Sequence, residues 1–182
     1  MQYDDEQLKS TVKDPKTRTK GFDLMVRQYS EQLYWQIRRI VLTHEDSNDI
    51  LQNTFMKAWS SLDNFHGESK LLTWLSRIAI NEALDFMRKQ KTRLAVSTDE
   101  EYTSVAAQLM ADNYFDGDET EAMLQQAIAN LPDVQRTVFL LRYYDDMKYS
   151  DISKVLGTSE GALKASYHIA VKKITDFFKR SD

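Results

Sequence analysis

The sequence predicts an all-α protein: two small helical domains joined by an acidic linker, the C-terminal one containing a helix-turn-helix. Apolar residues recur at spacings of three and four along most of the 182 residues, which is the period of an amphipathic helix. Only five glycines and two prolines interrupt that pattern. The charge is also uneven along the chain, and its distribution marks the linker.

The negative charge is concentrated in one segment. Residues 94–121 contain eight acidic and no basic residues, whereas residues 1–93 and 122–182 each carry +2, so the total is −4. A segment this acidic cannot bury enough apolar surface to fold alone, which predicts a solvated linker. We therefore expect a flexible N-terminus over residues 1–20, a first domain over 21–93, the linker, and a second domain after it.

Composition argues against several classes of function. The chain has no cysteine, which removes disulfides and thiolate chemistry, and no apolar run approaches the roughly 20 residues that span a bilayer. The N-terminus lacks the apolar stretch of a signal peptide, so we expect a cytoplasmic protein with no direct membrane insertion. The three histidines are scattered, and no metal-ligand spacing or phosphate-binding glycine loop is present. We expect no enzymatic activity, catalytic residue, metal or cofactor.

The first domain is expected to contain three helices, over residues 21–42, 47–62 and 71–90. The core residues of the first helix lie at helical spacing: Phe22, Met25, Val26, Tyr29, Leu33, Ile37, Ile40 and Val41. The core residues of the second are Leu51, Phe55, Ala58, Trp59 and Leu62. Those of the third are Leu72, Leu75, Ala79, Ala83 and Phe86.

The outer strip of the second helix is suited to protein contact. Its members are Asp49, Gln52, Asn53 and Met56. The strip is acidic to neutral and includes an exposed methionine, which favours a protein partner over DNA. An ordinary solvated helix face is the alternative.

The outer face of the third helix has the composition of a single-strand DNA surface. Its members are Trp74, Arg77, Asn81 and Arg88. A tryptophan ring stacks on bases, cations follow phosphates, and an amide can hydrogen-bond an unpaired base edge. The polar loop at residues 63–70 contains a glycine and is suited to flank a flipped base. The alternative is that Trp74 packs against the first helix.

The second domain shows the pattern of a helix-turn-helix. One helix ends before Pro132, another follows over residues 133–144, and a short helix over 149–156 is broken at Gly157 before the last helix begins at Ser159. The packing stripe of the last helix is Leu163, Tyr167, Ala170, Val171 and Ile174.

The opposite face of the last helix is basic and gives candidate contacts to duplex DNA. These are Ser159, Lys164, Ala165, His168 and Lys172. The second helix of this motif lies in the major groove, where lysine can donate to guanine and alanine can touch a thymine methyl group. The alternative is a surface helix of a generic bundle whose lysines are merely solvated.

In this order, the segments resemble the sigma factors of bacterial RNA polymerase, in particular the extracytoplasmic-function (ECF) group. The segment "DILQNTFMKAW" is similar to the family's D-L-x-Q-x-x-F-x-x-x-W, and "TWLSRIAINEALDFMRK" to its T-W-L-x-R-I-A-x-N-x-x-x-D-x-x-R. Residues 22–93 are similar to the family's region 2, and residues 122–179 to its region 4.

The resemblance implies a sigma factor that binds core RNA polymerase, recognises the −35 and −10 promoter elements and melts DNA. The strip on the second helix would dock on the clamp helices of the largest subunit. The −10 element would be held by Phe65, His66, Gly67, Glu68, Trp74, Arg77, Asn81 and Arg88. The −35 element would be read by the basic face of the last helix.

The resemblance also implies further partners. These are the flap of the second-largest polymerase subunit and an anti-sigma factor, often membrane-anchored. The chain alone is expected to be a monomer, and its linker would pass along the RNA exit and active-site channel of the polymerase. Two departures from the family pattern concern the sites: Ser166 and Ile169 stand where arginines are usual, and Asn53 replaces a common glutamate.

Two other functions remain open on the residues alone. A stand-alone helix-turn-helix regulator would bind duplex DNA without docking on polymerase, and it leaves the face around Trp74 without a role. A purely structural helical protein would use neither DNA face.

Overall fold

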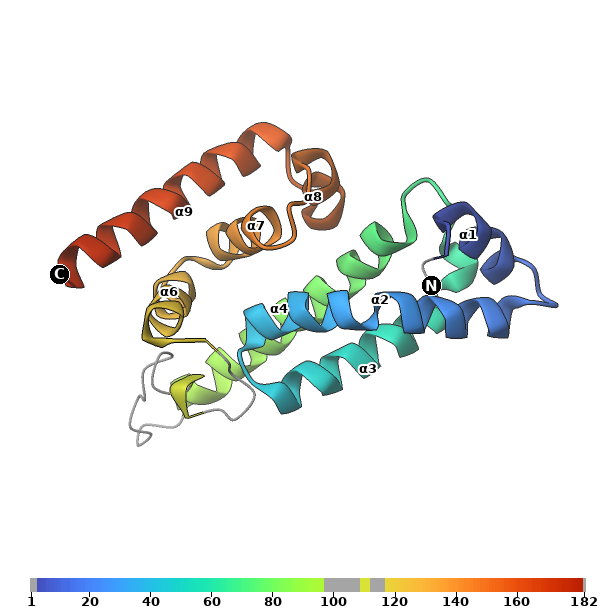
Figure 1. The fold of residues 1–182 in the computed structure, drawn as a ribbon, viewed down its shortest axis with the longest axis horizontal. Coiled ribbons are helices and arrows are strands. Elements are labelled where there is room, and N and C mark those ends of the chain that lie inside the picture. The colour runs from blue at the N-terminus through green and yellow to red at the C-terminus, as the bar shows by residue number, and fades with distance from the viewer. Residues whose placement is uncertain (1–2, 97–108, 112–116, 182) are drawn as a thin grey trace.

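The computed structural model describes residues 3–96, 109–111 and 117–181, and within these ranges the chain is helical and contains no strand (Figure 1). The elements are α1 (Asp5–Lys13), α2 (Arg18–Val41), α3 (His44–Ser60), the 3-10 helix η1 (Leu62–Asn64), α4 (Leu71–Val96), α6 (Glu119–Ala129), α7 (Asp133–Tyr143), α8 (Tyr149–Leu156) and α9 (Glu160–Ser181). This confirms the predicted all-α fold class. Among these helices, none combines the length and apolar character that a membrane span requires.

Helices α2, α3 and α4 form an N-terminal bundle in which each packs against the other two (Figure 1). The predicted core stripe of α2 is confirmed at Met25, Leu33 and Ile37, whose side chains are fully buried. Helix α2 ends at Leu42, which adopts the left-handed conformation with φ of 69° and turns the chain into α3. The Thr43 side chain then caps α3 by accepting a hydrogen bond from the Asp46 N–H.

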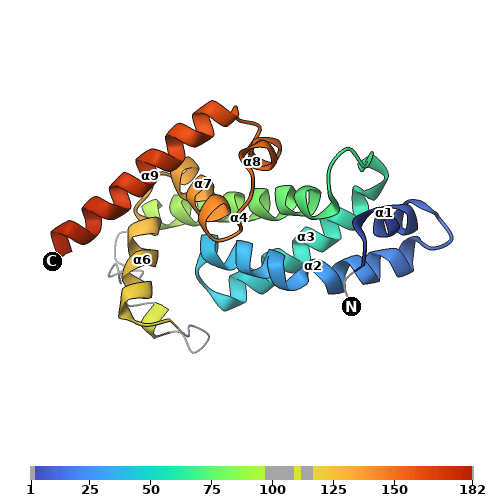
Figure 2. The same ribbon diagram turned by 45° about the horizontal axis from the view of Figure 1, so that its top comes forward.

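The expectation of a flexible N-terminus is wrong for Asp5–Lys13, which form helix α1 on the surface of α2 (Figure 2). Leu8 and Val12, four residues apart, are both buried against the bundle. The Asp4 side chain caps the helix by accepting a hydrogen bond from the Gln7 N–H. The cap and the apolar pair thus begin this helix, and its burial against a neighbouring helix stabilises it.

Gly21 allows α1 and α2 to approach closely. A Cβ at this position would lie 2.8 Å from the carbonyl carbon of Thr11 and 2.9 Å from the N of Val12. We expect Gly21→Ala to lower the free energy of unfolding by roughly 1–2 kcal/mol, since overpacking outweighs the gain in helix propensity. Urea denaturation measures this change.

A matched control for this substitution lies in α9. A Cβ on Gly161 would meet nothing within 4 Å. Gly161→Ala is therefore expected to stabilise the protein by up to about 1 kcal/mol through helix propensity. Equal effects of the two alanine variants would contradict the close contact between α1 and α2.

Helices α6, α7, α8 and α9 form the C-terminal bundle. The predicted helix ends are confirmed at two helix-breaking residues. Helix α6 ends before Pro132, and Gly157 ends α8 with φ of 65°. Leu163, Ala170 and Ile174 bury the inner stripe of α9, as predicted. Val171 was expected in that stripe but is exposed, because it lies at the edge of the face that α7 and α6 cover.

The predicted acidic linker is shorter at both ends than its charge indicates. Helix α4 continues to Val96, and α6 begins at Glu119 with Asp118 as its cap. The acidic residues at the start of α6 complement the positive end of the helix dipole, so here they help to begin a helix. Residues 97–108 and 112–116 lie outside the described residues.

The two bundles pack against each other, with α8 on α4 and α7 on α2 (Figures 1 and 2). At this contact, Arg39 Nη1 of α2 donates a hydrogen bond of 3.1 Å to Asp145 Oδ1, and its guanidinium lies 4.5 Å from the ring centroid of Tyr144. The Asp145 side chain is only 7% exposed. Burial raises the pKa of Asp145 to about 6, although Arg39 and a hydrogen bond with Gln36 act in the opposite direction.

Candidate nucleic-acid interface

The outer strip of α3 is exposed along its whole length. Asp49, Gln52, Asn53 and Met56 all face solvent, and the Met56 side chain is 62% exposed. The opposite side of the helix is held in the bundle by Ile50, Thr54 and Ala58. The structure thus presents the four predicted residues together on one surface.

Trp59 lengthens this surface and corrects one prediction. It was expected in the core but is 44% exposed, and its ring meets the Phe22 ring edge-on at 4.9 Å. The helical period placed Trp59 near the boundary of the buried face, and the partner ring at the rim of the bundle decides its burial. The α3 strip therefore ends in a large exposed aromatic side chain.

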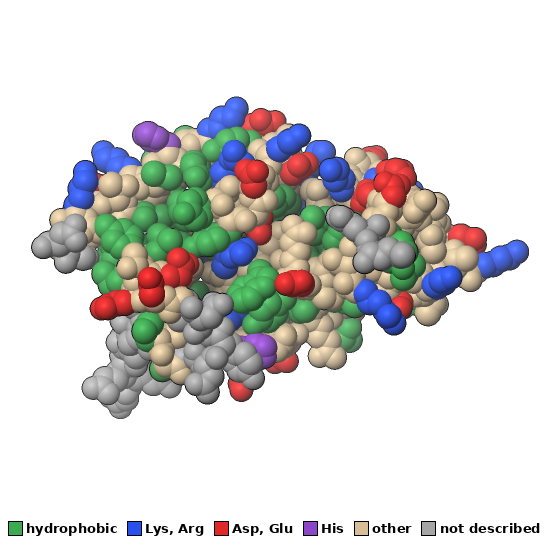
Figure 3. All heavy atoms as spheres, in the orientation of Figure 1, with side chains coloured by type: hydrophobic (Ala, Val, Ile, Leu, Met, Phe, Trp, Pro, Cys, Tyr) green, Lys and Arg blue, Asp and Glu red, His purple; other side chains and the backbone are tan. Residues whose placement is uncertain are grey.

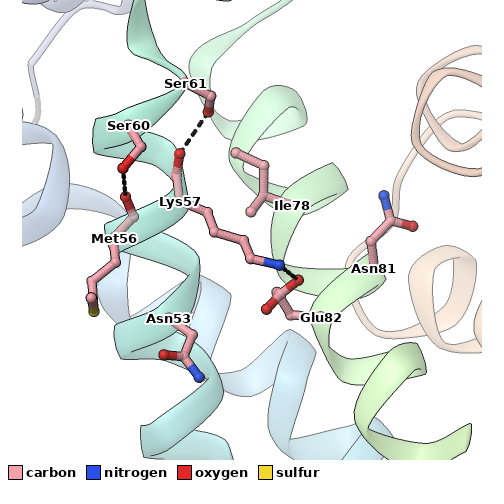
Figure 4. Close-up of a pocket in the computed structure, with 8 residues that line it drawn as sticks. All are labelled: Asn53, Met56, Lys57, Ser60, Ser61, Ile78, Asn81 and Glu82. Atoms are coloured by element: carbon pink, nitrogen blue, oxygen red, sulfur yellow. Dashed lines mark hydrogen bonds and ion pairs between the residues drawn. The ribbon is translucent and has the colours of Figure 1, made fainter.

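A groove of about 750 Å³ separates the outer strip of α3 from the outer face of α4 (Figure 4). Its lining residues are Asn53, Met56, Lys57, Ser60, Ser61, Ile78, Asn81 and Glu82. Lys57 reaches across the groove from α3 and forms an ion pair with Glu82 of α4. Asn53 and Asn81 belong to two differently predicted sites, yet they line the same groove, so the two surfaces are adjacent.

The outer face of α4 is open and mixed in charge. Arg77, Asn81 and Arg88 are exposed, as predicted. Arg88 Nη1 donates to Asp85 Oδ1 at 2.6 Å, so part of its charge is neutralised on the same helix. The exposed guanidinium of Arg77, one turn from the Asn81 amide, fits a phosphate backbone next to an unpaired base.

Trp74 and Phe65 differ from the prediction. Trp74 was expected to be exposed, but it is half-buried, with its ring 4.9 Å from the Phe65 ring. Phe65 was a candidate DNA contact but is only 5% exposed. It therefore packs against the Trp74 ring, and the exposed part of Trp74 is what remains for stacking.

The loop between η1 and α4 presents its polar residues to solvent. His66 and Glu68 are exposed, and Gly67 has φ of +83°, a conformation that favours glycine. Together with Trp74, this loop forms the N-terminal end of the α4 face. The predicted −10 residues thus lie in this loop and along one face of α4, with Phe65 buried against Trp74 and Arg88 roughly 20 Å along the helix from Trp74.

The five predicted duplex contacts are exposed on one side of the helix-turn-helix. They are Ser159, Lys164, Ala165, His168 and Lys172. Basic and histidine side chains follow the outer edge of α9 in the space-filling view (Figure 3). The Ser159 hydroxyl accepts a hydrogen bond from the Ala162 N–H at 3.4 Å, so it caps the helix that carries the other four.

Two neighbours partly hold the Lys164 side chain. Its Nζ lies 4.0 Å from Glu160 Oε2 and 5.6 Å from the ring centroid of Tyr149. Ile169 is exposed, so this part of α9 presents an apolar side chain to solvent. Ser166 is half-buried. In the described parts of the chain, no group of three or more acidic, histidine or cysteine side chains could hold a metal ion.

Comparison with known proteins matches two segments of the chain to family models. Residues 25–93 match the family model "Sigma-70 region 2", and residues 121–174 match "Sigma-70, region 4". The RNA polymerase sigma-H factor of Pseudomonas aeruginosa is 31% identical over 180 residues, which cover 90% of this chain and 88% of that protein. The ECF RNA polymerase sigma factor SigW of Bacillus subtilis is 30% identical over 156 residues, covering 81% of this chain and 83% of SigW.

Two solved structures have the same fold. The sigma factor RpoE of Bartonella quintana, in complex with the anti-sigma factor NepR, superposes with a TM-score of 0.72 and 25% identity over 88% of this chain and 98% of that chain. CnrH, in complex with the cytosolic domain of CnrY, superposes with a TM-score of 0.74 and 21% identity over 98% of this chain and 99% of CnrH. The likeness to CnrH extends over nearly the whole fold described above.

Proposed function

This chain belongs to the sigma-70 family of RNA polymerase sigma factors, in its extracytoplasmic-function group, and we propose that it divides that family's task among three surfaces of its own. It is a DNA-binding transcription initiation factor that joins core RNA polymerase and recognises promoters. The α3 strip meets the polymerase, the α4 face and its preceding loop hold the −10 element, and α9 reads the −35 element.

The α3 strip supports polymerase docking by its composition. It combines a carboxylate, two amides, an exposed methionine and an exposed tryptophan on one helix face. Aromatic and methionine side chains are enriched at protein interfaces. The polymerase partner is the clamp-helix region of the largest subunit.

The α4 face supports binding of the −10 element as a single strand. Trp74 offers the exposed part of its ring, Arg77 offers a cation and Asn81 offers an amide. Stacking and backbone attraction of this kind suit an unpaired base that has left the duplex. The exposed loop residues His66 and Glu68 flank the place where that base would sit.

The α9 face supports reading of the −35 element as a duplex. The turn at Gly157 separates α8 from α9 in the manner of a helix-turn-helix. The polar side chains near the start of α9 are directed outward, as recognition in the major groove requires.

We expect Lys164→Ala to cost roughly 1–3 kcal/mol at one base pair of the −35 element and little at the others, because a single side chain reads a single position. Binding of the polymerase holoenzyme to promoters with each base pair exchanged in turn measures this. Lys173→Ala is the matched control, because Lys173 is exposed on the same helix but lines the groove toward α6. A uniform loss across all base pairs would contradict base reading by Lys164 and indicate a phosphate contact.

The observation that carries the proposal is that a single-strand type of surface on α4 and a duplex type of surface on α9 occur in one chain. A stand-alone regulator needs only the second. The test is transcription with sigma-free core polymerase from the host and fragments of its genome as templates. Start sites that appear only when the chain is added support the proposal, and duplex binding without any start site supports the regulator.

An anti-sigma factor is the expected regulatory partner. The support is the Bartonella quintana relative, which was solved with one. The proposed partners, core polymerase and chromosomal promoters, also imply that the chain acts in the cytoplasm.

A further inference from the structure

The N-terminal segment contacts the loop before α4 at three places. Arg18 Nη2, at the start of α2, forms an ion pair of 2.6 Å with Asp63 Oδ1 of η1, directly before the loop. Lys13 Nζ donates a hydrogen bond of 2.9 Å to the carbonyl oxygen of His66, in its middle. Asp5 Oδ1 accepts a hydrogen bond of 3.0 Å from the Leu71 N–H, where the loop enters α4. The segment thus holds the loop at both ends and at its centre.

The central contact involves the residues nearest to the proposed base site. Lys13 Nζ lies 5.8 Å from the centroid of the Phe65 ring, on which Trp74 rests. A Cβ added to Gly67 would lie 2.8 Å from the same Nζ. Lys13 therefore packs on the loop backbone at the position where Gly67 has no side chain.

The support for Lys13 continues into the core of the bundle. Helix α1 is held on α2 by the buried Leu8 and Val12 and by the close approach at Gly21. Asp5 also accepts a hydrogen bond of 3.4 Å from the Tyr29 hydroxyl of α2. The loop is therefore connected to the hydrophobic core through α1.

We propose that Lys13 is a positioning residue for the loop between η1 and α4, which it holds in the shape that receives an unpaired promoter base of the −10 element. The inference rests on the proposed function, because it assigns a role to a residue outside the DNA-contacting set. A flexible loop would have to be ordered each time a base binds, and that entropy cost weakens binding and selectivity. A loop held in advance by Lys13 avoids this cost.

Three variants separate this role from general charge effects. Lys13→Met keeps the length of the side chain and removes its donor, whereas Lys13→Arg keeps both donor and cation. Lys16→Met is the charge-matched control, since Lys16 is exposed on the turn after α1. Lys13 is exposed as well, so Lys13→Met is expected to lower the thermal unfolding midpoint only slightly, and Lys13→Arg and Lys16→Met to leave it unchanged.

The experiment uses holoenzyme assembled with each variant on the promoter found by the transcription test. Competition among short nontemplate-strand oligonucleotides that differ at one −10 base measures base discrimination, and Trp74→Ala marks the loss of a direct contact. We expect Lys13→Met to lower discrimination roughly five- to tenfold, the usual net effect of losing one solvent-exposed hydrogen bond. Lys13→Arg should restore most of it, with the binding of core polymerase and of the −35 duplex unchanged.

The outcomes distinguish the role of Lys13 from the proposed −10 binding on which it rests. Wild-type discrimination in Lys13→Met, or an equal loss in Lys16→Met, overturns the role of Lys13 while the −10 assignment stands. If the wild-type holoenzyme does not discriminate among the oligonucleotides and Trp74→Ala changes nothing, the −10 assignment and the role of Lys13 fail together.

Discussion

Exchange of both Asp49 and Gln52 for lysine is expected to lower the affinity for core polymerase by about 100-fold or more. The two substitutions replace an acidic and a neutral side chain by two cations. Basic groups of the polymerase that contact Asp49 in the wild type would then face like charges, and such juxtapositions cost several kcal/mol. Both residues are exposed and lie on the side of α3 opposite Ile50 and Thr54, so the bundle itself is unaffected. Surface plasmon resonance with immobilised core enzyme measures the affinity.

The matched control is the pair Glu31→Lys and Gln32→Lys on α2. These residues are also an acid and an amide, and both are exposed. The control should bind polymerase as the wild type does, and the α3 double variant should retain its helix content by circular dichroism. An unchanged affinity in the α3 variant would place the docking surface elsewhere on the chain.

The substitution Arg39→Ala is expected to separate the two bundles at neutral pH. Removing the guanidinium leaves the carboxylate of Asp145 buried without its cation, which we expect to weaken the packing of the bundles by about 2–3 kcal/mol. The value is placed below that of a fully buried pair because the Arg39 side chain is 22% exposed. The radius of gyration from small-angle X-ray scattering should increase. Arg27→Ala, which breaks an exposed ion pair with Asp23 on the same helix, should leave it unchanged.

The same carboxyl group makes the packing depend on pH. The packed state raises the pKa of Asp145 from its ordinary value of 3.8 to about 6, so the protonated form favours packing. The stabilisation of the packed bundles by protonated Asp145 is complete below about pH 4 and is lost as the pH rises through 6. In Arg39→Ala, the bundles should therefore come together again at pH 5, as scattering at the two pH values would show. Persistent separation at pH 5 would contradict this role of Asp145.

The helices that sequence predicts best are those bounded by residues with a specific backbone requirement. Pro132 and Gly157 fix the ends of α6 and α8, and the predicted spans of α7 and α8 agree with the structure to within a residue. Helix α1 was missed because its only apolar pair is Leu8 and Val12. Asp4, a good cap just before this pair, was the signal that could have revealed it.

The polar faces of the candidate sites were predicted, but the burial of their aromatic residues was not. Helical period gives the direction in which Trp59 and Trp74 leave their helices. Contacts with Phe22 and Phe65, from other segments, decide how much of each ring stays exposed. The roles of these surfaces toward polymerase and promoter remain predictions.

The contacts that join distant segments had no local signal. Arg39 and Asp145 are 106 positions apart, and each looks like an ordinary surface residue in the sequence. The contacts of Lys13 with His66 and of Arg18 with Asp63 are of the same kind. Periodicity describes one helix at a time, so neither the packing of the bundles nor the support of the loop follows from it.

The packing of α7 and α8 on α2 and α4 has a consequence for the thermal unfolding of the protein. Because the buried side chains of both halves form one continuous apolar cluster, a cavity made in either half should depress the transition temperature of the whole chain. Calorimetry should then record one cooperative endotherm in place of two.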